Sequence, residues 1–578
     1  MWIEFGLVLL SIILAFCFPD LGSRWFRVAE RNFARLAQHR KLSVLLVGLA
    51  ALAARAAVLP ILPIPQPHLN DEFSHLLLAD TLLHGRLTNP TPPMWIHFET
   101  FHVIMHPTYA SMYPPAEGLI LAAGRAIAHE PFVGVWLSMG AMCAAICWML
   151  QGWVPEEWAF LGGLLAVIRL GIFSYWADSY WGNAVAAAIG GALVLGALPR
   201  ILRFERCRDA LVMGLGLAIL ANSRPYEGSV LSVPLAAVFF VWLFKTRRVS
   251  WRISLQRIIL PLTLVLLFAA AGTGYYFWRV TGNPFRMPQE VDRDTYAVAP
   301  YFLWQSPRTL PVYHHEALRD LYINYELDLY EQTRSAGKLM GIWMLRGLSF
   351  WSFYLGPLLT LPLILALATV PYGFTWNHFD WRTKFLFFAT TISIAGLAIE
   401  VFFYPHYAAP MTGLVYIAVL RAMSRVRGWR WHNKPIGKPL TRIVPLTALV
   451  LLFLRVFLFN SMTFPNELWS WYNARSVTTY RATIENQLHT YGGKQLVIVR
   501  FNPGLQSKYE WVYNEADIDR ANILWAWDMG SVANQELIAY YNDRHVWLVD
   551  SDEKGPELSP YPTSRLTGAL SPTRMVDP

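Results

Sequence analysis

The chain has 578 residues, of which 55% are hydrophobic and only 15% are charged. A soluble domain carries roughly 25% charged residues, so this composition excludes an ordinary soluble protein and a disordered one. The net charge is +9, from 48 Lys and Arg against 39 Asp and Glu, but in a membrane protein the location of the positive charges matters more than their sum. We therefore expect an integral membrane protein without a nucleic-acid partner.

Apolar stretches long enough to cross a bilayer recur along the chain, since such a helix needs about 20 apolar residues. The piece 116–128 is shorter and contains Arg125, so we expect an interfacial or re-entrant helix there. The sequence predicts about twelve spans, at roughly residues 2–18, 42–62, 132–150, 155–175, 183–198, 210–222, 228–244, 258–278, 350–370, 385–404, 407–420 and 443–462.

Lysine and arginine gather in four of the short connections, at residues 19–41, 199–208, 245–257 and 421–442. Loops of this kind face the cytoplasm. Both chain ends then lie outside, together with two long loops. We expect three parts, namely an extra N-terminal helix with a basic loop at 1–41, a transmembrane core at 42–462 with outer loops 63–131 and 279–349, and an outer segment at 463–578.

The last segment, 463–578, has a different sequence pattern. Gln495 to Arg500, Asn522 to Trp527 and Val546 to Asp550 are short apolar runs that predict strands, and Asn534 to Tyr541 has helical spacing. This order predicts a small α/β domain, followed from about Asp552 by a loose tail rich in Pro, Ser and Thr. The expected fold class is an all-α polytopic membrane protein with a small C-terminal α/β domain.

The sharpest chemical feature is the acid pair Asp71-Glu72, which follows a predicted span in the sequence HLNDEFSHLLLADTLLHGRL. The apolar spacing after it predicts an amphipathic helix on the membrane surface. One interpretation is structural, because acids at the start of a helix stabilise it. The other is functional, because a carboxylate here could take a proton from an acceptor hydroxyl or hold a metal.

An outward loop that opens with Asp71-Glu72, continues with Ala79 and Gly85, and reaches a Tyr-Pro-Pro turn at 113–115 resembles that of the GT-C glycosyltransferases. More narrowly, it resembles the protein O-mannosyltransferase and aminoarabinose-transferase branch. The resemblance implies a GT-C-like membrane core and transfer of a sugar from a polyprenyl-phosphate donor to a lipid, glycan or protein acceptor. It also implies that the site faces the periplasm from a bacterial inner membrane.

The resemblance extends to particular residues. Asp71 matches the acid proposed in the family as catalytic base, and Asp178, in SYWADSYWGN, matches a second acidic position in an outer turn. Tyr113 stands where the aminoarabinose branch usually carries Lys before its Pro-Pro pair. Because Tyr113 replaces this Lys, the binding of the donor phosphate is the part of the resemblance that does not carry over to this chain.

Other candidates come from the residues themselves. Arg224 could bind the leaving phosphate through its fork of donors, or reach lipid headgroups instead, and Glu227 could pair with it. His406 could touch phosphate or acceptor, or cap the next span. His75 is one of seven histidines in the first outer loop. Their spacing matches no zinc pattern, so the metal is unknown and a divalent ion is left open as a cofactor.

Two other classes compete with the enzyme. A transporter or lipid flippase for a glycoconjugate would place ionisable groups within its spans, as Arg55, Arg169 and Arg455 do here. Against transport, the sequence contains no internal repeat of the kind that many transporters have. A non-catalytic assembly protein would use the C-terminal domain to bind partners and would not need Asp71 and Glu72.

Overall fold

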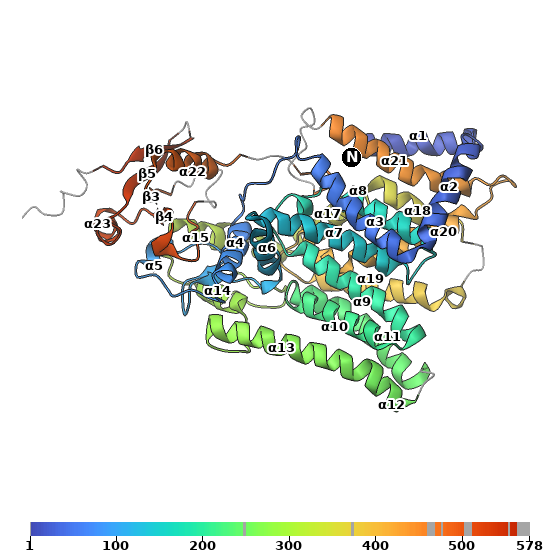
Figure 1. The fold of residues 1–578 in the computed structure, drawn as a ribbon, viewed down its shortest axis with the longest axis horizontal. Coiled ribbons are helices and arrows are strands. Elements are labelled where there is room, and N and C mark those ends of the chain that lie inside the picture. Colours follow the sequence, from blue (N-terminus) through green and yellow to red (C-terminus); the bar gives the residue numbers. More distant parts are fainter. Residues whose placement is uncertain are drawn as a thin grey trace, which may run out of the picture.

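A computed structural model describes the chain at residues 2–246, 250–370, 375–458, 469–474, 478–501, 511–552 and 555–562. Within this part, long helices form one body and a small β-sheet lies at one end of it (Figure 1). The elements of the expected outer loops gather between the helices and the sheet, whereas α2 and α12 lie toward the opposite end (Figure 1). This polarity agrees with the division into outer and basic loops.

Five helices are long and apolar enough to cross a membrane, within the described residues. A sixth unit is the pair α17 (Ala336–Tyr354) and α18 (Gly356–Ala368), which bends by 95° at Leu355. The five are α7 (Pro131–Leu150), α9 (Ala184–Phe204), α11 (Pro225–Val241, continued to Lys245), the run α12 (Trp251–Ser254) to α13 (Leu260–Thr281), and α21 (Gly437–Phe457).

The remaining predicted spans are also helical, but these helices are shorter or less apolar. A multi-pass helical architecture is therefore present, and the number of twelve crossings stays a prediction. These helices are α1 (Trp2–Cys17), α3 (Arg40–Ala57), α8 (Glu156–Leu170), α10 (Cys207–Ala221), α19 (Trp381–Ala398) and α20 (Thr412–Arg427), with α2 (Ser23–Gln38) lying in the basic connection after α1.

The first outer loop folds into α4 (Asn70–Leu83), α5 (Trp95–Phe98), the ribbon of β1 (Val103–Ile104) with β2 (Ala110–Ser111), and α6 (Pro115–Ala128). Helix α6 covers the piece expected to be interfacial or re-entrant. It packs on α7 with almost no gap, because a Cβ on Gly134 would lie 2.0 Å from the Ile120 carbonyl oxygen. This contact fixes α6 against a long apolar helix.

The second outer loop differs from its predicted bounds, 279–349. Helix α13 runs to Thr281, and α17 begins at Ala336 because its apolar pattern starts before the predicted end of the loop. The connection is correspondingly shorter and contains α14 (Pro288–Tyr296), α15 (Glu316–Arg319), the π-helical η4 (Asp320–Leu327) and α16 (Asp328–Thr333).

The predicted C-terminal strands and helix are confirmed. The sheet has the order β4-β3-β5-β6, in which the first three strands are parallel and β6 is antiparallel to β5. The expectation of a loose tail from Asp552 is wrong at β6, whose backbone pairs with β5. The elements are α22 (Tyr480–Tyr491), β3 (Gln495–Val499), β4 (Ile523–Trp527), α23 (Ser531–Tyr540), β5 (His545–Asp552) and β6 (Gly555–Pro560). The predicted start of the domain at Thr463 lies outside the described residues.

The C-terminal sheet shares one apolar core with the first outer loop. Phe73 of α4 stacks on Tyr513 at 4.5 Å between ring centroids, and both belong to the cluster that contains Leu496 and Trp525. The Trp527 indole N–H donates to the Glu99 carbonyl oxygen at 2.8 Å. The domain is therefore packed directly on the helix whose first turn carries the acid pair.

Candidate functional site

Asp71 lies in the first turn of α4 and is surrounded by hydrogen-bond donors. Its Oδ1 accepts from the Tyr113 hydroxyl and lies 2.9 Å from Nδ1 of His102. Its Oδ2 accepts from the Trp181 indole N–H at 2.5 Å. Burial raises the pKa of Asp71, but the charge and hydrogen bond of His102, together with His75 and the Trp181 hydrogen bond, outweigh it and the pKa is lowered on balance. Asp71 is therefore held as a carboxylate.

Glu72 is used differently from its neighbour. It is fully buried, and its carboxylate accepts from the backbone N–H groups of His68, Leu69 and Tyr180 at 2.9, 3.0 and 3.0 Å. The first two bonds cap α4 in the manner of a capping box. The third attaches the turn before α9 to the helix that carries Asp71. The structural interpretation of the acid pair thus describes Glu72, and the functional interpretation remains for Asp71.

Asp178 lies in the same turn, after the short 3₁₀ segment η1 (Tyr175–Ala177). Its carboxylate accepts from Nη2 of Arg55 at 3.0 Å, and both side chains are buried. The guanidinium also donates to the carbonyl oxygens of Leu62 and Pro63. Burial raises the pKa of Asp178 to about 8, although Arg55 acts to lower it. This buried hydrogen bond holds the end of α3 against the turn.

His75 lies one helical turn after Asp71 and is fully buried. Its ring stacks on Tyr113 at 4.4 Å, and neither ring nitrogen has a hydrogen-bond partner within the described part of the chain. Burial lowers its pKa to about 3 against the opposing charge of Asp71, and Arg224 adds to the lowering. A neutral imidazole with two unpaired nitrogens can donate one hydrogen bond and accept another, so His75 suits a polar ligand.

Arg224 lies at the start of α11 and reaches the same turn. It donates to the Gly182 carbonyl oxygen at 2.8 and 3.1 Å and to Glu227 at 3.2 Å, and its guanidinium lies 4.3 Å from the ring centre of Tyr407. The Gly182 contact places this cation beside Trp181 and hence near Asp71. Glu227 pairs with Arg224, as one interpretation of the sequence predicted.

His406 lies in the 3₁₀ segment η6 (Pro405–Met411), which leads into α20. Its Nδ1 lies 3.0 Å from the Tyr175 hydroxyl, and its ring meets Trp181 edge-on at 4.6 Å. Gly182 has a positive φ of +88°, and a Cβ there would lie 2.9 Å from the His406 ring. Glycine is required at this position because both backbone and space exclude a side chain.

The structure thus brings all the expected residues to one region at the outer-loop end of the helices. His102 and Trp181 were missed by sequence reasoning as partners of Asp71. The only signal for His102 was the density of histidines in its loop. Asp292, an acid of the second outer loop, is fully buried in α14, and its Oδ1 has no partner among the described residues.

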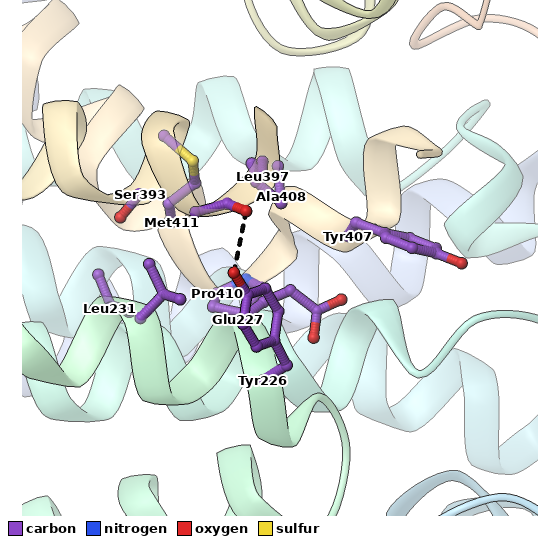
Figure 2. A pocket seen from close by; sticks show the side chains of 11 residues that line it. Tyr226, Glu227, Leu231, Ser393, Leu397, Tyr407, Ala408, Pro410 and Met411 are labelled. Atoms are coloured by element: carbon purple, nitrogen blue, oxygen red, sulfur yellow. Dashed lines mark hydrogen bonds between the residues drawn. The ribbon is translucent and has the colours of Figure 1, made fainter. Parts of the chain in front are cut away.

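A small cavity lies next to this region, between α11, α19 and η6 (Figure 2). Glu227 and Tyr407 line one side of it, and the Tyr226 hydroxyl donates to the Gly396 carbonyl oxygen at 3.0 Å across it. Its volume is about 10 Å³, which accommodates about one water molecule. This cavity is therefore too small to hold a substrate.

The carboxylates of the site do not fit the coordination of a divalent metal ion. Asp71 already accepts from three donors, Asp178 is paired with Arg55, and Glu72 accepts three backbone N–H groups. Mg²⁺ and Ca²⁺ prefer several unobstructed oxygen ligands. Over the described ranges, no group of three His, Cys, Asp or Glu side chains is arranged to hold a metal.

Fold and site together define a class: a multi-pass helical membrane protein whose polar, partly buried site lies at the ends of its helices, under a small α/β domain. No protein-family model matches the sequence, and no curated protein matches it. Comparison with solved structures finds several similar chains, among them those of an archaeal protein.

That protein is the oligosaccharyltransferase of Archaeoglobus fulgidus. In its complex with Zn and sulfate it is 12% identical over 88% of this chain and 68% of its own, with a TM-score of 0.47. In its complex with an inhibitory peptide and a dolichol-phosphate it is 10% identical over 88% of this chain and 69% of its own, with a TM-score of 0.38. Scores below 0.5 define neither family nor function.

Proposed function

We propose that this protein is a membrane glycosyltransferase that moves a sugar from a polyprenyl-phosphate donor to a lipid, glycan or protein acceptor. The observation that carries the proposal is the convergence at Asp71 of polar side chains from separate elements. Tyr113 and His102 come from the first outer loop, Trp181 from the turn before α9, and Arg224 approaches from α11. The site would face the periplasm of a bacterial cell.

The chemistry assigned to these residues follows from their charge. Asp71 is the general base that takes the proton from the acceptor hydroxyl. Arg224 supplies positive charge for the leaving phosphate, whose negative charge grows as the glycosidic bond breaks. His75, which is neutral and lacks partners in the described chain, hydrogen-bonds a hydroxyl of the sugar or the acceptor.

A groove between α10 and α13 supports a lipid-linked donor. The two helices touch where a Cβ on Gly214 would lie 2.9 Å from Val265. Nearer the site they border an open groove of about 800 Å³, lined by small and aromatic residues such as Ala218, Ala270 and Trp278. This volume is within the range of small-molecule pockets. We place the isoprenoid chain of the donor there.

The helices that line the groove contact the first outer loop through two hydrogen bonds. Asn222, which lines the groove, accepts from the backbone N–H of Ala116 at 3.0 Å through its carbonyl oxygen and is two residues from Arg224. On the α13 side, the Tyr276 hydroxyl donates to the Tyr113 carbonyl oxygen at 3.5 Å. A lipid in the groove would have its phosphate end beside Arg224.

The C-terminal domain is assigned to the acceptor side. It packs on α4 through Phe73, and the backbone N–H of Ala516 donates to Asp80 of the same helix at 2.8 Å. An acceptor bound by this domain would therefore be presented beside the first turn of α4. A position of this kind suits guidance of the acceptor rather than chemistry.

The alternative is a transporter or lipid flippase. Its best support was the arginines within predicted spans, but these have structural partners. Arg55 pairs with Asp178, Arg169 lies 3.4 Å from Glu4 of α1, and Arg455 donates to the carbonyl oxygens of Tyr472 and Ala474. These contacts favour a fixed helical scaffold and therefore the transferase.

The test is transfer by the purified protein in lipid nanodiscs, supplied with radiolabelled polyprenyl-phosphate sugars and a membrane extract as acceptor source. We expect the wild type to transfer label and Asp71→Asn to lose about 10²- to 10⁴-fold in turnover, the usual effect of removing a general base, while donor binding is kept. Normal turnover by Asp71→Asn would refute the assignment. Label that only moves across vesicle membranes, without a new glycosidic bond, would favour the flippase.

A further inference from the structure

The donors around Asp71 are an imidazole, a phenol and an indole, and this set has a consequence for catalysis. We propose that His102 is the positioning residue of Asp71, fixing the orientation and charge of the base so that transfer proceeds without a divalent metal ion. This inference rests on the proposed function. It concerns a residue 31 positions from Asp71 in the sequence, brought to it by the fold of the first outer loop.

The geometry of His102 is specific. Its Nδ1 lies 2.9 Å from Asp71 Oδ1 and 3.0 Å from the Tyr113 hydroxyl, so the three side chains share one hydrogen-bonded junction. The junction orients the carboxylate through Oδ1. Since a carboxylate has about four lone-pair positions and three are occupied, one position on Oδ2 remains for the acceptor hydroxyl.

The backbone of His102 is held in an unusual conformation to reach this place. Its φ is +59°, in the left-handed region that residues other than glycine rarely adopt. The Ser74 hydroxyl donates to the His102 carbonyl oxygen at 2.7 Å, and the Met112 backbone N–H donates to it at 3.2 Å. Because Ser74 lies in α4 itself, one helix fixes both the base and the backbone of its partner.

The charged groups around His102 agree with a protonated ring. On its other side, α14 packs on β1 through Val291 and Ile104, which brings Asp292 near. Burial lowers the pKa of His102, but the charge and hydrogen bond of Asp71 and the charges of Asp292 and Glu326 together outweigh it, so the pKa is raised on balance. Nη1 of the neighbouring cation Arg293 donates to Oε2 of Glu326 at 2.6 Å.

A positively charged imidazole supplies what a metal ion would otherwise supply at this place, a positive charge at a fixed distance from the carboxylate. During transfer, the acceptor oxygen forms a bond to the anomeric carbon, and the bond from that carbon to the phosphate oxygen breaks with its electron pair. The acceptor proton passes to Oδ2 of Asp71 and then to water. His102 keeps its own proton throughout and holds Asp71 in place.

The experiment compares His102→Ala with His102→Asn in the full-length protein. Asn tolerates the left-handed backbone, and its side-chain N–H can replace Nδ1–H. We expect His102→Ala to lower kcat about 10- to 100-fold, the value of a hydrogen bond to a charged group, at unchanged donor KM. His102→Asn restores the hydrogen bond but not the charge, so it should recover only part of the loss, and added imidazole should partly rescue His102→Ala. His106→Ala, an exposed histidine of the same loop, should match the wild type.

Two further measurements complete the test. Excess EDTA should leave wild-type turnover unchanged; loss of turnover that Mn²⁺ or Mg²⁺ restores would overturn the proposal. So would wild-type kcat in both His102 variants. If the wild type transfers no sugar, the proposed function fails, but the pairing is still tested by NMR titration of labelled histidine. The His102 resonance should titrate at lower pH in Asp71→Asn than in the wild type, and an unchanged titration would contradict the pairing.

Discussion

At the scale of single residues, two neighbouring carboxylates have separate tasks because their partners differ. Asp71 meets side-chain donors and keeps one lone-pair position available, whereas Glu72 accepts three backbone N–H groups and is fully buried. The same difference predicts that conservative changes at the two positions will have different effects.

Glu72→Gln should destabilise the protein rather than stop the reaction. The amide NH₂ of Gln would face one of the backbone N–H groups of His68, Leu69 or Tyr180, leaving a buried donor unpaired at a cost of about 1–3 kcal/mol. We expect a lower Tm in a detergent melt and near-normal turnover per folded molecule. Turnover as low as that of Asp71→Asn at an unchanged Tm would mean that Glu72 acts in the chemistry.

The ion pair of Asp71 and His102 predicts a pH window for transfer. The pKa of Asp71 is lowered below 3.8 and that of His102 is raised above 6.5. The stabilisation from Asp71 is present above pH 3.8 and is lost as the pH falls through its folded pKa. That from His102 is present below pH 6.5 and is lost as the pH rises through its folded pKa.

The rate of transfer should therefore have an acid limb below pH 3.8 and an alkaline limb above pH 6.5. A kcat profile of the wild type and of His102→Asn would check this expectation. The alkaline limb should disappear in the variant, because Asn does not titrate. An identical alkaline limb in both proteins would assign that limb to another group.

At the scale of elements, helices α10 and α13 line the groove that we assign to the donor lipid. Ala270→Trp should fill part of this groove and raise the KM for a long-chain donor. It should leave the KM for a donor with only two isoprene units close to the wild-type value. Leu267→Trp is the matched control, because Leu267 lies on α13, is exposed, and does not line the groove. Equal effects of both variants on both donors would contradict the assignment.

At the scale of the whole molecule, the outer-loop elements and the C-terminal sheet lie at one end, and α2 and α12 toward the other (Figure 1). Together with the basic loops, this arrangement predicts that the C-terminus faces the periplasm. Alkaline phosphatase, which is active only there, should be active when fused at the C-terminus and inactive when fused after Arg430. The reverse pattern would invert the topology and place the site at the cytoplasmic face.

The sequence by itself determined the local features of the protein. Apolar length predicted the helices, short apolar runs predicted β3, β4 and β5, and an acid pair after a span singled out Asp71. These predictions succeed because periodicity and hydrophobicity act between residues close in sequence. Strand β6 was missed because its residues, GPELSP, carry no strand pattern and are ordered only by pairing with β5.

Only the tertiary structure decided which residues surround Asp71. Trp181 is 110 positions away in the sequence and Tyr113 is 42, and no local pattern links such distant residues. The split of the acid pair into a capping Glu72 and an available Asp71 also depends on Tyr180, whose backbone reaches α4 through the fold. The physical reason is that hydrogen bonding and charge act through space, so the chemistry of a carboxylate is set by neighbours that the chain order does not reveal.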